Sequence, residues 1–482
     1  MTRLTDERNN DMDMKMMTGE ARGNRKKFVR VERGSGKQDE IFRSEDGSQK
    51  IVLGVPEPEK MNRRKLILLA RRIIATAKAK RVESLRIDPI LFSFENANLS
   101  DQELGELVAT NMLMANYAFT EFLTKPEDGF PEVKEIIFEG ASKEFVLGVN
   151  RGIIIGEEVN ACRRLANLPG GDVTPQTLAD EAKKIAKLHG MTVKILGVSE
   201  MKKLGMGGVL GVGKGSVFPP KFIVLEYMNA PKSSASGRGK KDVGPVVLVG
   251  KGVTFDTGGI NLKPENSMLG MNMDMSGGSA VLHTVAAIAR LKVKCNLVAL
   301  VPAVENMPSG SSYRPGDILR SMSGKTIEVN NTDAEGRIIL ADALTYAKRY
   351  KPSLVVDVAT LTGAAVVALG ERASVLFTMD EALEKRFREL GELSGDFVWP
   401  LPLWEEYDEE IKGTVGDWSN IGKTRYGGAI TAAAFLKQFA EGYPWVHLDI
   451  APRMTSIEGE FLAKGAAGTP VRLLVKLLEG KL

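Results

Sequence analysis

The chain has 482 residues, more than one compact core usually holds, so two domains are expected. Hydrophobic residues make up 43% of it and charged residues 26%, as in ordinary globular proteins, and the net charge of +4 is too small to indicate nucleic-acid binding by itself. No apolar run reaches the ~20 residues that span a bilayer, and no apolar secretory leader is present, so no membrane association is expected.

Cysteine and histidine are both scarce, which limits the kinds of metal site and catalytic site that this chain can form. Cys162 and Cys295 lie far apart with apolar neighbours, a pattern typical of reduced thiols in a cytoplasmic protein. The spacing of His189, His283 and His447 matches no zinc-ligand pattern, and three histidines are few for a Ser-His-Asp enzyme. Any metal site in this chain is therefore expected to use mostly oxygen ligands.

The N-terminal third alternates strand and helix patterns after a polar start. Residues 1–27 are polar, charged and Met-rich without periodicity, and we expect a disordered tail. Residues 28–150 are expected to form a small α/β domain. The predicted strands cover 28–31, 51–55, 85–87 and 133–138, and the predicted helices cover 63–80 and 101–123.

A helix predicted over 152–168 ends at Pro169-Gly170-Gly171, so residues 151–171 are expected to link two domains. Residues 172–482 again alternate and are expected to form the larger domain. Its predicted helices cover 175–188, 279–291, 338–350, 381–393, 429–439 and 471–478. Its predicted strands cover 192–196, 222–227, 245–249, 297–301, 354–358 and 445–450.

The segment 331–337, Asn-Thr-Asp-Ala-Glu-Gly-Arg, places two carboxylates and a guanidinium within five positions, Asp333 to Arg337. A strand-like segment precedes it and an apolar run follows, so it is expected to form an interior turn. Buried like charges need a cation to stay ionised, and a divalent metal meets that need better than one arginine. Gly336 removes a side chain where a metal or substrate could approach. A polar surface turn is the ordinary alternative for an isolated acid pair.

A second charged region follows the apolar strand predicted at 245–249. The glycine-rich loop 250–259 leaves the carboxyl end of that strand, where ligands bind in open α/β sheets, and it carries Lys251 and Asp256. Lys263 follows, and Asp274 stands between two methionines, an apolar setting in which a charge needs a partner. Each of these residues alone is more often an ordinary surface or capping residue.

Together, four carboxylates would balance the charge of two divalent ions, and paired metals are a standard device for hydrolysis. The four are Asp256, Asp274, Asp333 and Glu335. A lysine ligates a metal only as the neutral amine, so Lys251 would need a strongly depressed pKa. Lys263 and Arg337 would remain as cations for transition-state charge.

Four segments resemble the leucyl aminopeptidase family of two-metal exopeptidases: GKGVTFDTGGINLKP (250–264), MNMDMSGG (271–278), YRPGDIL (313–319) and NTDAEGRIILADALTYA (331–347). Weaker matches at 357–364, 428–436 and 447–451 extend the resemblance over roughly residues 150–482. The resemblance implies a mixed-sheet α/β/α metallo-exopeptidase domain that removes N-terminal, preferably leucine-like residues from peptides with a free N-terminus. It also implies a macro-like type for the small N-terminal α/β domain, and a homohexamer.

The resemblance further implies the roles of individual residues. One metal ion, manganese or zinc, would be held by Asp256, Asp333 and Glu335, and the other by Lys251, Asp256, Asp274 and Glu335. Water bridging the two ions would attack the substrate, Lys263 would stabilise the oxyanion, and Arg337 would hold a bicarbonate ion as the general base. The pocket for the N-terminal side chain would be lined by Met271, Thr360, Gly363, Ala451 and Met454. Asn272, Asn330 and Pro452-Arg453 depart from the family pattern, and they bear on side-chain preference rather than on the ligands.

The sequence offers two alternative interpretations. A nucleic-acid-binding role, alone or beside peptidase activity, rests on a basic tail (Arg22, Arg25, Lys26, Lys27, Arg30) and a basic loop (Arg238–Lys241), for which solvated flexible segments are the favoured interpretation. The segment 208–215 nearly fits a phosphate-binding loop, but Gly215 stands where that loop needs Ser or Thr. The three histidines are expected to have structural roles, and His447 to make a structural hydrogen bond.

Overall fold

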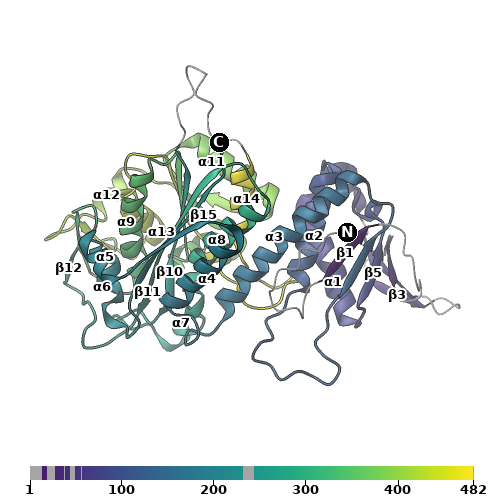
Figure 1. The fold of residues 1–482 in the computed structure, drawn as a ribbon, viewed down its shortest axis with the longest axis horizontal. Helices are drawn as coiled ribbons and strands as arrows, with labels where there is room; N and C mark the ends of the chain where they lie inside the picture. Colours follow the sequence, from purple (N-terminus) through teal and green to yellow (C-terminus); the bar gives the residue numbers. More distant parts are fainter. Residues whose placement is uncertain are drawn as a thin grey trace, which may run out of the picture. The chain divides into compact units, whose positions relative to one another are not determined.

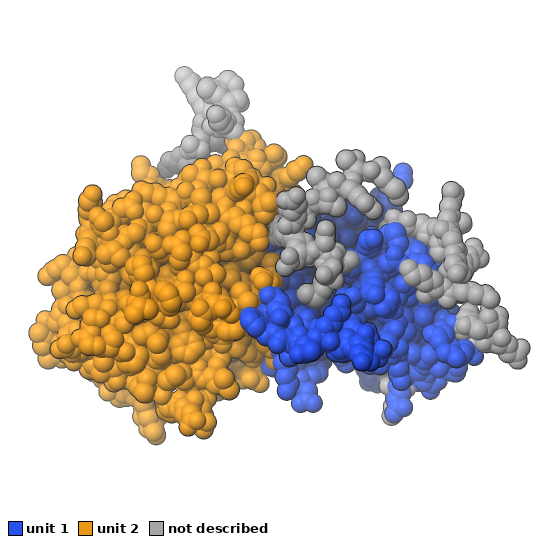
Figure 2. All heavy atoms as spheres, turned by 60° about the horizontal axis from the view of Figure 1, so that its bottom comes forward, with its two compact units in different colours: residues 1–160, 457–464 blue, residues 161–456, 465–482 orange. Residues whose placement is uncertain are grey.

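The computed structural model describes residues 14–18, 28–36, 38–43, 49–55, 57–231 and 244–480. The chain forms two compact units, coloured separately in Figure 2: unit 1 contains residues 1–160 and 457–464, and unit 2 contains residues 161–456 and 465–482. Within the described ranges, no helix is both long and apolar enough to cross a membrane.

Unit 1 is built on a six-stranded sheet in the order β1-β6-β5-β2-β4-β3, parallel except for the edge pair β3–β4. The strands are β1 Lys15–Thr18, β2 Val29–Gly34, β3 Glu40–Arg43, β4 Gln49–Gly54, β5 Ser84–Ile87 and β6 Glu135–Phe138. Helix α1, Arg63–Ala79, begins where the Asn62 side chain accepts a hydrogen bond from Lys65 N–H, and α2, Asp101–Asn116, begins at a capping box of Ser100 and Glu103.

Residues 15–18 fall in the segment for which the sequence predicts a disordered tail, yet they form strand β1. This strand pairs in parallel with β6, and Met14 and Met16 pack against the hydrophobic core of unit 1. The methionines that looked like tail composition therefore include core side chains. The rest of that segment, residues 1–13 and 19–27, lies outside the described residues.

Helix α3 covers Lys143–Asn167 and starts well before the predicted residue 152. Glycine explains the difference, because a Cβ on Gly152 would lie 2.5 Å from the Glu106 carbonyl oxygen, and one on Gly148 would overlap the carbonyl of Gln102. The glycines therefore permit close packing of α3 on α2 instead of ending the helix. The boundary between the units lies inside α3, at residues 160 and 161.

Unit 2 is built on a nine-stranded mixed sheet between two groups of helices (Figure 1), the α/β/α arrangement that the resemblance implies. The order is β16-β15-β18-β14-β9-β11-β8-β7, and β10 pairs with β11 off this path. The central strands β18, β14, β9 and β11 are parallel. The strands are β7 Thr192–Leu196, β8 Lys221–Met228, β9 Val246–Gly250, β10 Gly252–Asp256, β11 Asn296–Asn306, β14 Leu354–Ala359, β15 Ser374–Phe377, β16 Val398–Pro400 and β18 Trp445–Asp449.

One group of helices is α4 Pro175–His189, α8 Ser276–Arg290, α11 Glu381–Ser394 and α14 Val471–Glu479, and the other is α6 Gly207–Val212, α9 Glu335–Ala347, α12 Glu406–Glu409 and α13 Gly428–Lys437. Shorter helices are α5 Val198–Lys203, α7 Glu265–Met268 and α10 Gly363–Leu369. A small sheet combines β12 Ile318–Arg320, β13 Thr326–Glu328 and β17 Trp418–Ser419. Each helix and strand predicted for 172–482 is present; β7 has the predicted bounds, and most of the others have shifted ends.

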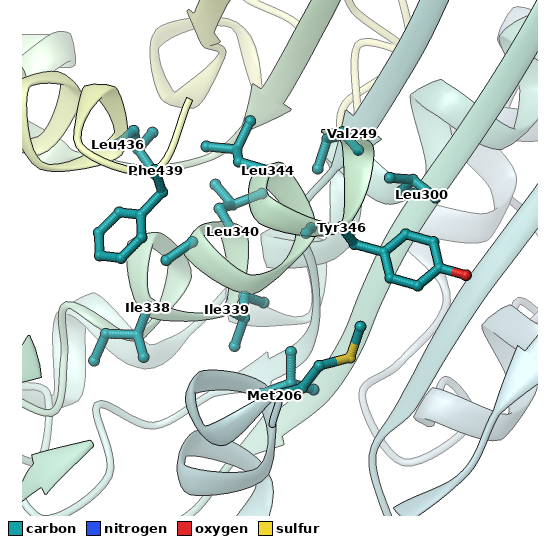
Figure 3. Packing of buried hydrophobic residues seen from close by; sticks show 14 of the residues in the cluster. Met206, Val249, Leu300, Ile338, Ile339, Leu340, Leu344, Tyr346, Leu436 and Phe439 are labelled. Carbon is teal, nitrogen blue, oxygen red and sulfur yellow. The ribbon is translucent and has the colours of Figure 1, made fainter. Parts of the chain in front are cut away.

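Helix α9 is packed inside a large hydrophobic cluster of unit 2. Figure 3 shows its apolar side chains among those of neighbouring elements, and Leu340, Leu344 and Tyr346 are each at most 5% exposed. Close packing on this scale leaves a helix little freedom to shift. The first turn of α9 carries Glu335 and Arg337, so the core holds two of the predicted site residues in place.

Candidate functional site

The predicted metal ligands meet at the carboxyl ends of neighbouring strands of unit 2. Lys251 directly follows β9, and Asp256 is the last residue of β10. Asp274 lies in a 3₁₀ turn, Met271–Met275, that leads into α8, whereas Asp333 and Glu335 lie at the turn that opens α9. Open α/β sheets bind their ligands at this edge.

Three carboxylates form the centre of the site. One oxygen from each of Asp256, Asp333 and Glu335 lies within 4.8 Å of the others, an arrangement that can hold a metal ion. Lys263 Nζ lies 2.9 Å from Asp256 Oδ2 and also pairs with Asp333. Two of the three carboxylates therefore share the ammonium group of Lys263.

Lys251 extends the cluster to the fourth carboxylate. Its Nζ lies 2.8 Å from Asp274 Oδ2 and 2.8 Å from Glu335 Oε1, and it donates a hydrogen bond to the carbonyl oxygen of Thr360 at 2.9 Å. The Thr360 hydroxyl in turn donates to Asp274 Oδ1 at 2.7 Å. All five predicted ligands thus lie in one connected network.

The charges of this network are not balanced by protein groups alone, since four carboxylates face two ammonium groups. Burial raises the pKa of Glu335 to about 8, with the Asp256 charge adding to the effect, and burial raises the pKa of Asp274 to about 6. Protons and a metal cation would therefore compete for these carboxylates. A divalent cation would restore the ionised state of these carboxylates, so the residues present fit a metal centre.

The expectation of a depressed Lys251 pKa does not hold in this network. Burial alone would lower the pKa of Lys251, but the charges of Asp274 and Glu335 outweigh burial and raise it. Lys251 is therefore a charged ion-pair partner here, and it could ligate a metal only after the metal displaces its proton.

Arg337 lies on the same turn of α9 as Glu335 but points to a different neighbour. Its Nη1 donates a hydrogen bond to the Asn420 carbonyl oxygen at 2.8 Å, and its buried Nε has no hydrogen-bond partner in the described part of the chain. Burial lowers the pKa of Arg337 to about 10, which still leaves the guanidinium charged at neutral pH. A buried, partly unpaired guanidinium is suited to holding an anion.

The five predicted pocket residues come from three loops. Thr360 and Gly363 follow β14, Ala451 and Met454 follow the adjacent β18, and Met271 opens the 3₁₀ turn that carries Asp274. Helix α10, which starts at Gly363, contacts the short turn Ala451–Arg453. The structure therefore brings Gly363 and Ala451 to neighbouring elements beside the ligand network.

Two supporting residues were not predicted as site residues. Asn306 donates to Asp256 Oδ1 at 2.8 Å and to the Thr332 carbonyl at 3.0 Å, while the Tyr313 hydroxyl donates to that same carbonyl at 2.7 Å. These bonds fix Asp256 and the residue before Asp333. Tyr313 is the first residue of the segment 313–319, which resembles the family, so that segment could have indicated it. Asn306 is the last residue of β11, five residues beyond the predicted end of this strand at 301.

The residues that depart from the family pattern make local structural bonds. Asn272 Nδ2 donates to the carbonyls of Ala166 and Leu168, and Asn330 Nδ2 donates to the Ser419 hydroxyl at 2.9 Å. Arg453 donates to a backbone carbonyl at 2.7 Å. None of these bonds reaches a predicted metal ligand.

The structure describes the segment that nearly fits a phosphate-binding loop, His447, and one residue of the basic tail. The Gly213–Gly215 turn follows α6 and leads to β8, so it opens no helix as a phosphate-binding loop would. His447 makes the structural contact that was predicted, with its Nδ1 2.6 Å from Asp357 Oδ1. The basic loop and most of the basic tail lie outside the described residues, and Arg30 pairs with Glu32 at 3.3 Å.

Comparison with known proteins agrees with this geometry. The cytosol aminopeptidase family, catalytic domain, matches residues 160–475. A probable cytosol aminopeptidase of Roseiflexus castenholzii is 45% identical over 417 residues, covering 84% of this chain and 83% of that protein. One of Burkholderia mallei is 47% identical over 365 residues, covering 75% of this chain and 70% of that protein.

Among solved structures, the bottromycin maturation enzyme BotP in complex with Mn is similar, with a TM-score of 0.82 and 31% identity, covering 94% of this chain and 98% of that one. The family match includes the segments that carry the whole carboxylate and lysine network. The chain therefore belongs to the cytosol aminopeptidase family, and it is a metal-dependent aminopeptidase that hydrolyses peptides.

Proposed function

We propose that this aminopeptidase removes leucine-like apolar residues from the free N-termini of peptides. The observation that carries the proposal is the buried network in which four carboxylates outnumber two lysines. Its five ligands for two divalent ions are Lys251, Asp256, Asp274, Asp333 and Glu335. All five lie in unit 2.

The two ions would be manganese or zinc. The mainly oxygen ligation is compatible with manganese, and a manganese complex of the similar BotP supports testing this ion first. When bound, the ions would supply an acidified water and polarise the scissile carbonyl. The carboxylates and Lys251 would fix where that chemistry takes place.

Lys263 would stabilise the oxyanion that develops on the attacked carbonyl. The charges of Asp256 and Glu335 raise its pKa despite burial, so the ammonium group stays protonated at neutral pH. A preorganised cation of this kind acts on charge that appears only in the transition state.

Arg337 would hold a bicarbonate ion, which would supply a general base for the reaction. The unpartnered buried Nε supports this role, because that N–H would otherwise remain unsatisfied. The Asn420 carbonyl fixes the other branch of the guanidinium at 2.8 Å.

The pocket for the N-terminal side chain would be formed by Met271, Thr360, Gly363, Ala451 and Met454. These side chains are small or apolar, which suits leucine or methionine. We further propose a cytoplasmic homohexamer, for which the family resemblance is the support. Nucleic-acid binding is not part of this proposal.

The test is hydrolysis of leucine anilide with added Mn²⁺ or Zn²⁺ by the wild type and by Asp333→Ala. We expect metal-dependent turnover that the substitution abolishes, while N-acetyl-leucine anilide resists cleavage because its amine is blocked. Equal activity of the two proteins, or none in the wild type with either metal, would contradict the proposed function.

A further inference from the structure

A single buried carboxylate joins the two loops that carry four of the five proposed pocket residues. Asp449 is the last residue of β18, pairs in register with Ala359 at the end of β14, and is fully buried. One loop follows each of these strands. Asp449 therefore stands at the point where both loops leave the sheet.

Three hydrogen-bond donors from the two loops converge on this carboxylate. Asp449 Oδ1 accepts from the backbone N–H groups of Leu361 and Ala451, each at 3.1 Å. Asp449 Oδ2 accepts from the Thr362 hydroxyl at 2.7 Å. Because Leu361 and Thr362 lie inside the loop 360–363, one side chain fixes both walls of the proposed pocket.

The Thr362 hydroxyl links Asp449 to the start of helix α10. Thr362 is the N-cap of α10, and its hydroxyl oxygen accepts from Ala365 N–H at 3.1 Å while its proton goes to Asp449. The first turn of α10, including Gly363, is thereby oriented by the carboxylate.

The other end of the same loop is tied to two proposed metal ligands. The Thr360 carbonyl accepts from Lys251, and the Thr360 hydroxyl donates to Asp274. The loop 360–363 is thus fixed on the metal ligands at one end and on Asp449 at the other.

We propose that Asp449 is a positioning residue that sets side-chain selectivity, by holding the loop 360–363 and Ala451 at the spacing that the substrate's N-terminal side chain requires. The chemistry of the side chain explains why an aspartate stands here. An ionised carboxylate has two acceptor oxygens and no donor, so it can accept all three hydrogen bonds, whereas an asparagine would replace one oxygen with an N–H donor. This inference rests on the proposed function and deepens it.

The test compares kcat and KM for the anilides of Ala, Val, Leu, Met and Phe with the manganese-loaded enzyme. In Asp449→Ala we expect the preference for Leu over Ala, measured as kcat/KM, to fall roughly tenfold, mainly through a higher KM for Leu. Thr362→Val should move the preference in the same direction, and Thr362→Ser, which keeps the hydroxyl, should restore it. Asp449→Asn should lie between wild type and Asp449→Ala because it retains one acceptor oxygen.

The matched control is Asp342→Ala. Asp342 is equally buried and accepts backbone hydrogen bonds from Val209 at 2.9 Å and Met322 at 2.7 Å, without a bond to either pocket loop. We expect this variant to lose stability but to keep the wild-type preference.

An unchanged preference in both Asp449→Ala and Thr362→Val, or an equal loss in Asp342→Ala, would overturn the inference. If Asp449→Ala does not fold, Thr362→Val and Thr362→Ser decide. Failure of the proposed function is distinguishable, because the wild type itself would then cleave none of the anilides.

Discussion

Gly336 and Lys251 occupy adjoining space in the metal-ligand network. A Cβ on Gly336 would lie 2.6 Å from Lys251 Cε and 2.8 Å from its Nζ. The lysine cannot simply turn aside, since Asp274, Glu335 and the Thr360 carbonyl hold its ammonium group. The absent side chain at position 336 therefore makes room for Lys251, a proposed metal ligand.

Gly336→Ala should displace Lys251 and weaken metal binding, although alanine favours the helix by about 1 kcal/mol relative to glycine. We expect the affinity for Mn²⁺, measured by calorimetry, to fall about 10–100-fold, as when supporting groups of a metal site are lost. Gly310→Ala is the control, because nothing lies within 4 Å of a Cβ there. Wild-type affinity in Gly336→Ala would show that Lys251 is not a ligand.

Lys263→Gln should separate catalysis from metal binding. Loss of the cation should lower kcat for leucine anilide about 10²–10³-fold, the usual effect of removing an oxyanion-stabilising donor. Metal affinity should stay the same or increase, because Lys263 competes with metal for Asp256 and Asp333. Exposed Lys214→Gln serves as the control. A loss of metal binding that accounts for the whole loss of activity would contradict this role.

Metal binding should strengthen as pH rises. With the pKa of Glu335 at about 8 and that of Asp274 at about 6, protons compete with metal below these values. We expect the Mn²⁺ affinity to increase roughly tenfold or more from pH 6 to pH 8. Calorimetry in two buffers should also show proton release at pH 7. A flat profile would mean that these carboxylates are already ionised without metal.

The metal-free protein should show the opposite trend in stability. Because the folded-state pKa of Glu335 lies above its unfolded value, its contribution to the free energy of unfolding is present below the unfolded pKa and is lost as pH rises through the folded pKa. Urea unfolding of the metal-free chain should therefore need less urea at pH 8 than at pH 6. Glu335→Gln should reduce this difference, and an unchanged difference would exclude Glu335 as its source.

The proximity of candidate site residues could be predicted from the sequence where these residues lie close together along the chain. Asp333, Glu335 and Arg337 share one short segment, so their relation could be read from the residues themselves. The link from Lys251 through Thr360 to Asp274 could not, because it depends on β9 and β14 pairing across more than 100 residues of chain. Local patterns carry no information on such pairings.

Two elements near the site were misjudged for identifiable reasons. The glycines of 250–259 indicate a loop, yet Gly252–Asp256 forms β10 beside β11, consistent with the β-favouring Val253, Thr254 and Phe255. The sequence predicts that strand β11 covers 297–301, and Pro302 follows, a residue type that is disfavoured inside sheets. It runs on to Asn306, and so the residue that orients Asp256 was overlooked.

Asp357 should stabilise unit 2 through His447. The two side chains are fully buried on adjacent strands, 2.6 Å apart, and Asp357 also accepts from the Trp445 indole at 2.7 Å. Asp357→Asn should cost about 3 kcal/mol, the scale for breaking a buried pair. Because the Asp357 charge raises the pKa of His447 against the effect of burial, the stability from this pair is present below the unfolded pKa and lost as pH rises through the folded pKa.

The loss in Asp357→Asn should accordingly be larger at pH 6 than at pH 9, as measured by urea unfolding. Exposed Asp180→Asn is the control and should change stability little at either pH. An equal loss at both values would indicate that His447 is neutral throughout and that the bond to Trp445 dominates.

The path of residues 457–464 limits how this protein can be taken apart. The chain leaves unit 2 after Ser456, contributes Leu462 to the packing of unit 1, and returns at Gly465. A cut at residue 160 would therefore leave Leu462 without its packing partners, in a segment that begins three residues beyond Met454. Each unit contains two separate stretches of chain, so neither can be removed by a single cut. A chimera that replaces the N-terminal unit must therefore also redesign residues 457–464.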